Sequence, residues 1–516
     1  MKNRVMRSLS VLLFLCFVLQ ALVAQAADSV SPRVELENPY LLAGQKQTVH
    51  LLIRFAVEGE RDGDRQRENL NLGLVIDRSG SMADRGKLTY AKRAAQDLIG
   101  HLKADDIIGI VEYDDRISVL WPSSSADDPN AIRRAIARLT PGGSTNLAGG
   151  MMEGGREVLR NGLGGIRRVF LMSDGLANVG VTDRHAIARL ASSMRRNGVR
   201  ITTMGLGLDY DEDLMQLVAE SGGGSYYFIE HPNQIARIFS EEMGRLDRLV
   251  SRDATLEFNW GNAVKRAEVV GYPSSRKGGG TQVNLTDFYQ GENRTVLVKL
   301  QLAPCPKGKI DLGSMTLGYQ DLVDGRSKKI SRPVKAVCTR EVAEVKENEN
   351  KKVAVESRLI VADQVHEEAV RLYEAGKAPE ARQAMASLSQ DLSKDMDRYQ
   401  DPQLQKKLDA LSMEKAEIAQ AESDASYRKS YLKKRKSAFF SSQKGNRGGY
   451  MLQEGTQGYQ VKDLQQALKK EGLYKGPEDG IFDDEVRLAV EKYQKAKGLP
   501  VDGIAGPKTL KGLGLY

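Results

Sequence analysis

The chain has 516 residues and a formal net charge of +8 at pH 7. This length is too great for one hydrophobic core, so a single-domain protein is excluded and several domains are expected. Three of the positive charges lie in the first seven residues, and much of the remaining positive excess is concentrated in one later segment. We expect no nucleic-acid partner.

Residues 1–26 have the three parts of a secretory signal peptide. A positive end is followed by an apolar stretch over residues 9–23 and by the small-residue sequence Ala-Gln-Ala at 24–26. A retained membrane anchor is the alternative, but the stretch is short for a spanning helix and the cleavage pattern follows at once. No other apolar run is long enough to cross a bilayer. We therefore expect an exported, periplasmic or wall-associated envelope protein without a transmembrane segment in the mature chain.

Strand and helix patterns then alternate along residues 69–246. Before them, residues 27–68 hold a β-like alternation that ends in a charged stretch. The run from Asn71 to Ile76 is almost continuously apolar, as in a strand buried on both faces of a parallel sheet. The alternation predicts a doubly wound α/β domain over residues 69–246.

Oxygen-bearing side chains follow the strands of this predicted domain. Residues 77–82 read Asp-Arg-Ser-Gly-Ser-Met, residues 142–146 read Gly-Gly-Ser-Thr-Asn, and Asp174 ends a second buried-strand pattern. Open α/β sheets bind ligands at the carboxyl ends of their strands. Each segment alone is typical of an ordinary turn or helix cap. Together they favour a hard cation, Mg²⁺ or Mn²⁺ with Ca²⁺ as a further candidate, and suit zinc poorly.

These positions resemble the metal-ion-dependent adhesion site of von Willebrand factor A domains over roughly residues 69–245. The matching residues are Asp77, Ser79, Ser81, Thr145 and Asp174. The resemblance implies that the hydroxyls of Ser79, Ser81 and often Thr145 ligate the metal, while the two carboxylates act directly or through water. It also implies one open metal position, which a Glu or Asp of a partner protein would occupy.

From residue 247 to residue 340 the hydrophobic period changes to two, which predicts a β-sandwich. We expect the strands of residues 27–68 to join it, so that the α/β domain is an insertion. After removal of the signal peptide only Cys305 and Cys338 remain, and an even pair in an exported chain favours a disulfide over two free buried thiols.

Residues 341–424 are charged, alanine-rich and helical in period. Pro379 and Pro402 stand where helices are expected to start, so we predict three helices packed as hairpins. Residues 425–449 follow as a basic segment, with eight Lys or Arg residues and no acid between Arg428 and Arg447. Such a run could hold an anionic polymer, but a solvated linker is the favoured interpretation.

The last segment, residues 450–516, resembles the small three-helix peptidoglycan-binding module of exported bacterial wall proteins. Two Asp-Gly-Ile elements mark turns before helices, at Asp479-Gly480 and at Asp502-Gly503. Asp483 stands where that family usually has glycine, so we expect a local difference there. The resemblance implies peptidoglycan as a partner, while the sequence does not identify the contact residues.

No catalytic residue is predicted. The five histidines lack zinc-protease spacing, and no Gly-x-Ser-x-Gly elbow is present. A carboxylate pair for glycoside cleavage stays open because acidic residues are abundant. The sequence therefore favours an envelope protein that binds peptidoglycan and a protein partner. A wall-remodelling enzyme or its regulator, and a structural spacer with a vestigial metal loop, are the alternatives.

Overall fold

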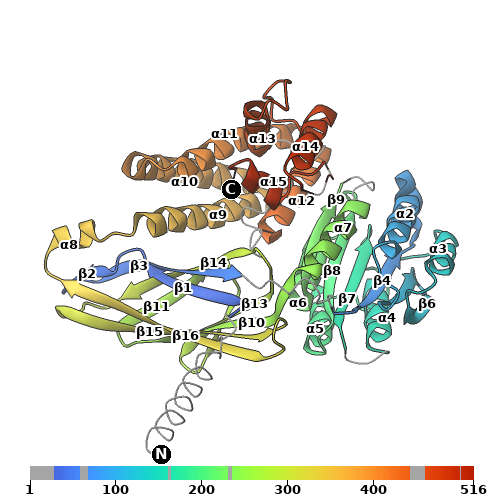
Figure 1. The fold of residues 1–516 in the computed structure, drawn as a ribbon, viewed down its shortest axis with the longest axis horizontal. Coiled ribbons are helices and arrows are strands. Elements are labelled where there is room, and N and C mark those ends of the chain that lie inside the picture. The colour runs from blue at the N-terminus through green and yellow to red at the C-terminus, as the bar shows by residue number, and fades with distance from the viewer. Residues whose placement is uncertain are drawn as a thin grey trace, which may run out of the picture.

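The computed structural model describes residues 28–57, 68–160, 164–230, 235–441, 452, 459–499, 501 and 503–515. The expected signal peptide, residues 442–449 of the basic segment, and Asp502 lie outside these ranges. Within them, no helix combines the length and the apolar character that crossing a membrane requires. Figure 1 shows an α/β domain beside a two-sheet β domain, with helices above them.

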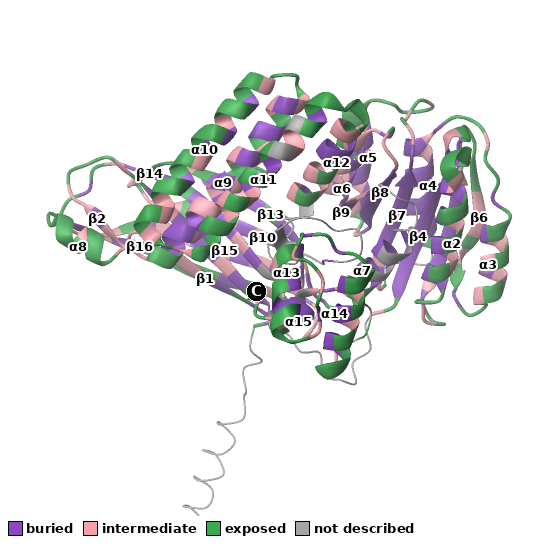
Figure 2. Cartoon of the chain, turned by 90° about the horizontal axis from the view of Figure 1, so that it is seen from above, coloured by how far each residue is buried: buried purple, intermediate pink, exposed green. Residues whose placement is uncertain are grey.

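The α/β domain is built on a six-stranded sheet in the order β6-β5-β4-β7-β8-β9. All its strand pairs are parallel except β5 with β6, which form a hairpin. Every residue of β4 is buried, because helices cover both faces of the sheet (Figure 2). The strands are β4 (Leu70–Asp77), β5 (Ile107–Tyr113), β6 (Ile117–Ser125), β7 (Ile166–Ser173), β8 (Arg200–Leu206) and β9 (Gly223–Ile229).

Two separate hydrophobic cores lie on the two faces of this sheet. One core contains side chains of α2, α3 and α7, and the other contains side chains of α4, α5 and α6. The helical elements are η1 (Gly80–Gly86), α2 (Lys87–Ile99), α3 (Pro129–Ala137), α4 (Leu147–Arg160), α5 (Arg184–Arg196), α6 (Glu212–Gly222) and α7 (Ile235–Asp247). The doubly wound arrangement brings the loops that follow β4 and β7 to one edge of the sheet, since these two strands are parallel neighbours.

The two-sheet domain pairs strands from both sides of the α/β domain in the sequence. One sheet has the order β1-β3-β14-β11 and the other the order β12-β13-β10-β15-β16-β2. The strands are β1 (Val30–Leu36), β2 (Tyr40–Leu42), β3 (Gln47–Val57), β10 (Leu249–Trp260), β11 (Val264–Val270), β12 (Ser274–Lys277), β13 (Gly280–Tyr289), β14 (Asn293–Leu302), β15 (Gly308–Asp321) and β16 (Ser327–Thr339). The α/β domain is thus placed in the sequence between β3 and β10.

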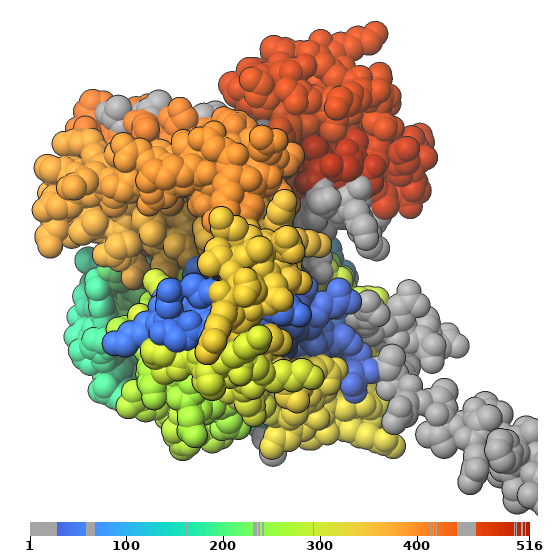
Figure 3. All heavy atoms as spheres, turned by 90° about the vertical axis from the view of Figure 1, so that its left-hand side faces the viewer, coloured from blue at the N-terminus to red at the C-terminus, as the bar shows by residue number. Residues whose placement is uncertain are grey.

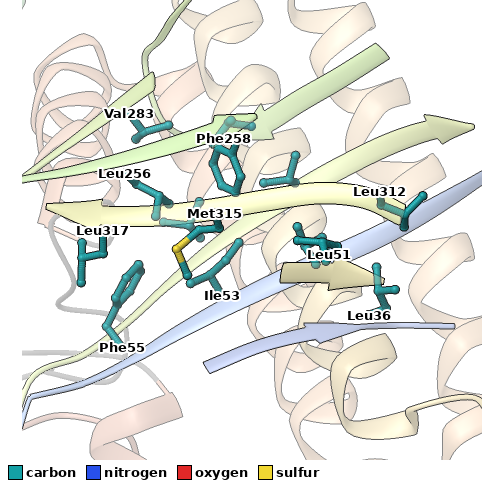
Figure 4. Close-up of a cluster of buried hydrophobic side chains, with 14 of the residues drawn as sticks. Leu36, Leu51, Ile53, Phe55, Leu256, Phe258, Val283, Leu312, Met315 and Leu317 are labelled. Atoms are coloured by element: carbon teal, nitrogen blue, oxygen red, sulfur yellow. The ribbon is translucent and has the colours of Figure 1, made fainter. Parts of the chain in front are cut away.

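One hydrophobic core lies between the two sheets. Figure 4 shows Ile53 and Phe55 of β3 with Phe258 of β10 and Met315 of β15 in this core. At one end of the sheets, a disulfide joins Cys305, before β15, to Cys338 of β16.

Four helices and one short helix follow the two-sheet domain. They are α8 (Val342–Glu347), α9 (Lys351–Glu374), α10 (Ala378–Tyr399), α11 (Pro402–Ser423) and α12 (Ala425–Ser441). Pro402 is the first residue of α11, and Pro379 is the second residue of α10. Side chains of α9, α10 and α11 share one core, and α9 also packs on the four-stranded sheet through Val353 and Ile360.

The prediction of a solvated linker after residue 424 is wrong as far as residue 441, because these residues form α12. The Lys433 ammonium donates to the carbonyl oxygen of Tyr210 at 2.9 Å and pairs with Glu212. Phe440 lies in the core beneath α4, α5 and α6, with its ring edge-on to Tyr226. The basic residues of α12 are therefore paired with acids, some in the α/β domain, as for Lys433, and some in α11, as for Arg435 with Glu414.

The C-terminal module contains α13 (Tyr459–Lys470), α14 (Asp484–Ala496) and α15 (Pro507–Gly512) around its own core. Figure 3 shows this module as a separate lobe, in red. Two buried glutamines hold its turns: Gln465 accepts the Gly480 N–H at 2.9 Å, and Gln494 accepts the Gly503 N–H at 3.0 Å. Asp483 caps α14 by accepting the Val486 N–H, which gives the departure from the family pattern a structural reason.

Candidate functional site

The loop after β4 is held against the glycine-rich turn at residues 142–145 by main-chain hydrogen bonds. The Gly142 N–H donates to the Arg78 carbonyl at 2.7 Å, and the Gly80 N–H donates to the Gly143 carbonyl at 3.0 Å. A Cβ at Gly143 would lie 1.6 Å from an oxygen of Asp115, so this position requires glycine. The two loops are therefore fixed side by side at the carboxyl edge of the sheet.

Hydroxyl and carboxylate oxygens from three loops converge at this edge. The hydroxyl oxygens of Ser79 and Ser81 are 3.2 Å apart, and the Ser81 hydroxyl donates to Asp174 Oδ1 at 2.8 Å. A Cβ built on Gly175 would lie 3.2 Å from the Thr145 hydroxyl oxygen and 3.7 Å from that of Ser81. A side chain at position 175 would therefore crowd these hydroxyls, and glycine leaves them room. The structure brings together all five residues that the sequence singled out.

Asp77 lies at the base of this cluster and is fully buried. Its carboxylate accepts hydrogen bonds from the Ser79 N–H at 2.8 Å, the Ser173 hydroxyl at 2.7 Å and the Tyr113 hydroxyl at 3.4 Å. Burial nevertheless raises the pKa of Asp77 to about 6, and the nearby charge of Asp174 acts in the same direction. The hydrogen bonds therefore do not fully replace the hydration of the carboxylate.

Asp174 has a cationic partner inside the domain. The ammonium of Lys87, the first residue of α2, lies 2.5 Å from Asp174 Oδ2, and both side chains are buried. This contact orients the carboxylate so that its other oxygen meets Ser81. Sequence reasoning did not identify Lys87, Ser173 or Tyr113. Only Ser173 had a signal, since it directly precedes Asp174, whereas Lys87 and Tyr113 reach the site from other elements.

The donor set determines which ligands this cluster could take. Three hydroxyls and two carboxylates are hard oxygen donors, which suit Mg²⁺, Mn²⁺ or Ca²⁺. Across the described ranges, no group of three or more His, Cys, Asp or Glu side chains forms a metal site of another kind. A cation bound here would lower the raised pKa of the buried Asp77, because a positive charge favours the ionised form.

Two parts of the chain match known domain families. Residues 71–241 match the von Willebrand factor type A domain, and residues 457–513 match the peptidoglycan binding domain. The chain is therefore a multidomain protein that contains both, and its C-terminal module indicates an association with the cell wall. The enzymes that share this module do so only there: the spore cortex-lytic enzyme of Bacillus cereus is 44% identical over 59 residues, which is 11% of this chain and 23% of the enzyme.

Two curated relatives match over longer stretches. An uncharacterized protein of Synechocystis is 27% identical over 292 residues, which is 55% of this chain and 69% of the relative. The uncharacterized protein YfbK of Escherichia coli is 31% identical over 252 residues, which is 46% of this chain but only 43% of YfbK.

Two solved structures share the fold over most of the chain. A von Willebrand factor type A protein from Catenulispora acidiphila has a TM-score of 0.58 at 17% identity, covering 72% of this chain and 89% of that chain. The ArnB paralog VWA2 from Sulfolobus acidocaldarius has a TM-score of 0.54 at 18% identity, covering 80% and 99%. At these identities the likeness extends to the fold alone.

Proposed function

We propose that this is an exported cell-envelope protein that binds peptidoglycan through its C-terminal module and a partner protein through a divalent cation. The cation would be Mg²⁺ or Mn²⁺, with Ca²⁺ as a further candidate. Its ligands would come from Asp77, Ser79, Ser81, Thr145 and Asp174. The observation that carries the proposal is the convergence of these oxygens from three loops at one edge of the sheet.

The side chains around the proposed site have separable tasks. The hydroxyls of Ser79, Ser81 and Thr145 offer neutral oxygens, so most of the charge of a cation would remain uncompensated. Ser173 and Tyr113 hold the Asp77 carboxylate, and Lys87 holds that of Asp174. When bound, the cation would supply an electrophilic position for a Glu or Asp of the partner.

A wall-remodelling enzyme, or a regulator of one, is the second candidate. It is favoured only by the likeness of the C-terminal module to modules of wall-lytic enzymes, and that likeness covers 59 residues for the cortex-lytic enzyme. We propose a non-catalytic role, because a shared binding module carries no chemistry of its own. Release of muropeptides from purified peptidoglycan by the mature chain would instead establish an enzyme.

Cation binding is tested first by calorimetric titration of the full mature chain with MgCl₂ or MnCl₂. We expect saturable binding that the Ser79→Ala and Ser81→Ala variants lose. Ser125→Ala is the matched control, because Ser125 is exposed and pairs with Ile107 at the opposite end of β5. Equal binding by all four proteins, or no binding by the unmodified chain, would rule out the proposed site.

Wall and partner binding are tested separately. The full chain should sediment with purified peptidoglycan whether or not EDTA is present. Capture of a protein from envelope extract should be lost both with EDTA and in Ser79→Ala. Sedimentation that depends on EDTA, or capture that survives it, would contradict the division of labour between the two domains.

A further inference from the structure

A pocket of about 260 Å³ lies where the α/β domain meets the two-sheet domain. From the α/β domain it is lined by Arg167 and Arg168 of β7 and by Arg200 of β8. The two-sheet domain contributes Arg252 and Asp253 of β10 and Asp287 of β13. It lies at the amino ends of β7 and β8, and so at the opposite edge of the sheet from Asp77 and Ser79.

The carboxylates in the pocket accept hydrogen bonds from only some of the guanidinium N–H groups. Asp287 accepts from Arg168 at 3.1 Å and from Arg200 at 3.2 Å, and Asp253 pairs with Arg200. Arg168 and Arg200 are only 2% and 4% exposed. In the described part of the chain, Nε of Arg167, Nε of Arg168, and both Nε and Nη1 of Arg200 are buried without an acceptor. Such donors are costly to leave unpaired.

Positive charge is in excess around these donors. Arg195, at the end of α5, lies beside Arg200, and Arg252 pairs with Glu68. Around the pocket, the guanidinium groups of Arg167, Arg168, Arg195, Arg200 and Arg252 outnumber the carboxylates of Glu68, Asp253 and Asp287. Glu242 also interacts with Arg168, but it is paired with Arg245. The pKa of Arg167 is lowered by burial and by its neighbours Arg252 and Arg200, as expected where cations crowd together.

If this interface served only to hold the two domains together, each buried guanidinium group would be paired with a carboxylate or a carbonyl oxygen. Here two carboxylates serve Arg168 and Arg200, and the remaining buried N–H groups have no acceptor among the described residues. Guanidinium groups match tetrahedral oxyanions well, because their planar fork can donate two parallel hydrogen bonds. The volume also restricts the ligand, since it lies below the roughly 300–1,000 Å³ of pockets for drug-sized molecules.

We propose that this pocket binds a small oxyanion of the phosphate type, either free phosphate or the phosphoryl group of a larger molecule. Arg167, Arg168 and Arg200 donate the N–H groups that lack acceptors. Because the lining residues come from two domains, a bound oxyanion connects the amino ends of β7 and β8 to β10 and β13. The site is independent of the proposed cation site.

The test is calorimetric titration of the full mature chain with inorganic phosphate, against sodium chloride at equal ionic strength. We expect a dissociation constant of about 1 mM or tighter, equivalent to about −4 kcal/mol. Arg167→Gln should weaken binding about tenfold, because it removes a guanidinium from the pocket. The variant should fold normally, because Arg167 is only partly buried and its hydrogen bond to the Asn197 carbonyl is local. Arg189→Gln is the matched control, since the side chain of Arg189 is 73% exposed on α5.

Parallel titration with glycerol 3-phosphate distinguishes the two sources of the phosphoryl group. If the ester binds more tightly than inorganic phosphate, the natural ligand is the phosphoryl group of a larger molecule. If the ester binds more weakly, the natural ligand is the free phosphate ion. Arg200→Lys keeps the charge that faces Asp287 but removes the fork, so it should also weaken binding while the circular dichroism stays unchanged. Absence of phosphate-dependent heat, or unchanged affinity in both Arg167→Gln and Arg200→Lys, would overturn the proposal.

Discussion

Replacing Asp77 with Asn should stabilise the cation-free protein at pH 7 while abolishing its response to divalent cations. The pKa of this buried carboxyl is raised from 3.8 to about 6, so the folded state favours the neutral form. The stability that this group contributes is fully present below about pH 4 and is lost as the pH rises through 6. At pH 7 the Asp77 carboxylate is ionised, and its burial therefore costs stability, whereas asparagine has no charge to bury.

The size of the effect follows from the pKa difference. A difference of about two units, at 1.36 kcal/mol for each unit, corresponds to about 3 kcal/mol at pH 7. The hydrogen bonds from the Ser79 N–H and the Ser173 hydroxyl already offset part of the burial cost in this pKa, so the expected gain is up to about 3 kcal/mol. For a domain of this size, each kcal/mol raises the melting temperature by about 2–4 °C. By linkage, the gain should fall below about 1 kcal/mol at pH 4.

The assay is differential scanning calorimetry at pH 7 and pH 4, in EDTA and in excess MgCl₂. Asp127→Asn is the control, because Asp127 is exposed and the substitution removes the same charge. MgCl₂ at 100 times the dissociation constant should stabilise the unmodified chain by about 2.7 kcal/mol, and so raise its melting temperature, but leave Asp77→Asn unchanged. A variant that is less stable than the unmodified chain at pH 7 in EDTA would refute the reasoning from burial.

Three further outcomes follow from the fold. Reduction of the Cys305–Cys338 disulfide, whose cysteines are 33 residues apart, should destabilise the two-sheet domain by about 3–4 kcal/mol in urea unfolding; an unchanged midpoint would contradict this. Phe440→Ala should weaken docking of α12 by about 3–5 kcal/mol and speed its amide exchange, since the ring is buried against Tyr226, and unaltered exchange would count against that contact. A fragment of residues 252–516 should lack a folded two-sheet domain, because β1, β2 and β3 are absent from it and β14 loses its neighbour β3; cooperative unfolding of its β structure would disprove this.

The sequence carried enough information to predict which side chains meet at the sheet edge. Asp77 and Asp174 each follow a strand that reads as buried on both faces, and the carboxyl ends of parallel neighbours must lie together. Lys87 and Tyr113 could not be predicted in the same way. Their contacts depend on the rotation of α2 and on the depth of β5 in the sheet, which hydrophobic periodicity does not determine.

Helix α12 illustrates the limit of local composition. Its basic residues, with serines and no acid between Arg428 and Arg447, resemble a solvated segment. Arg435 pairs with Glu414 of the preceding helix, but other acids that pair with this segment are distant: Lys433 pairs with Glu212, and Lys434 with Glu230. The composition of a segment of about twenty residues cannot indicate ion-pair partners that lie about 200 residues away in the sequence. The apolar residues Tyr431, Leu432 and Phe440, all of them buried, were the local signs of buried contacts.

The placement of the α/β domain between β3 and β10 has a mechanical consequence. β3 lies in one sheet between β1 and β14, and β10 lies in the other between β13 and β15. A tensile load pulling on the α/β domain is therefore shared by two interior strands. Neither strand lies at the edge of its sheet, since each is hydrogen-bonded to a neighbour along both sides. Pulling the α/β domain away requires the hydrogen bonds of several strand pairs to break together in shear. Attachment through two interior strands is therefore far stiffer than attachment through a single linker.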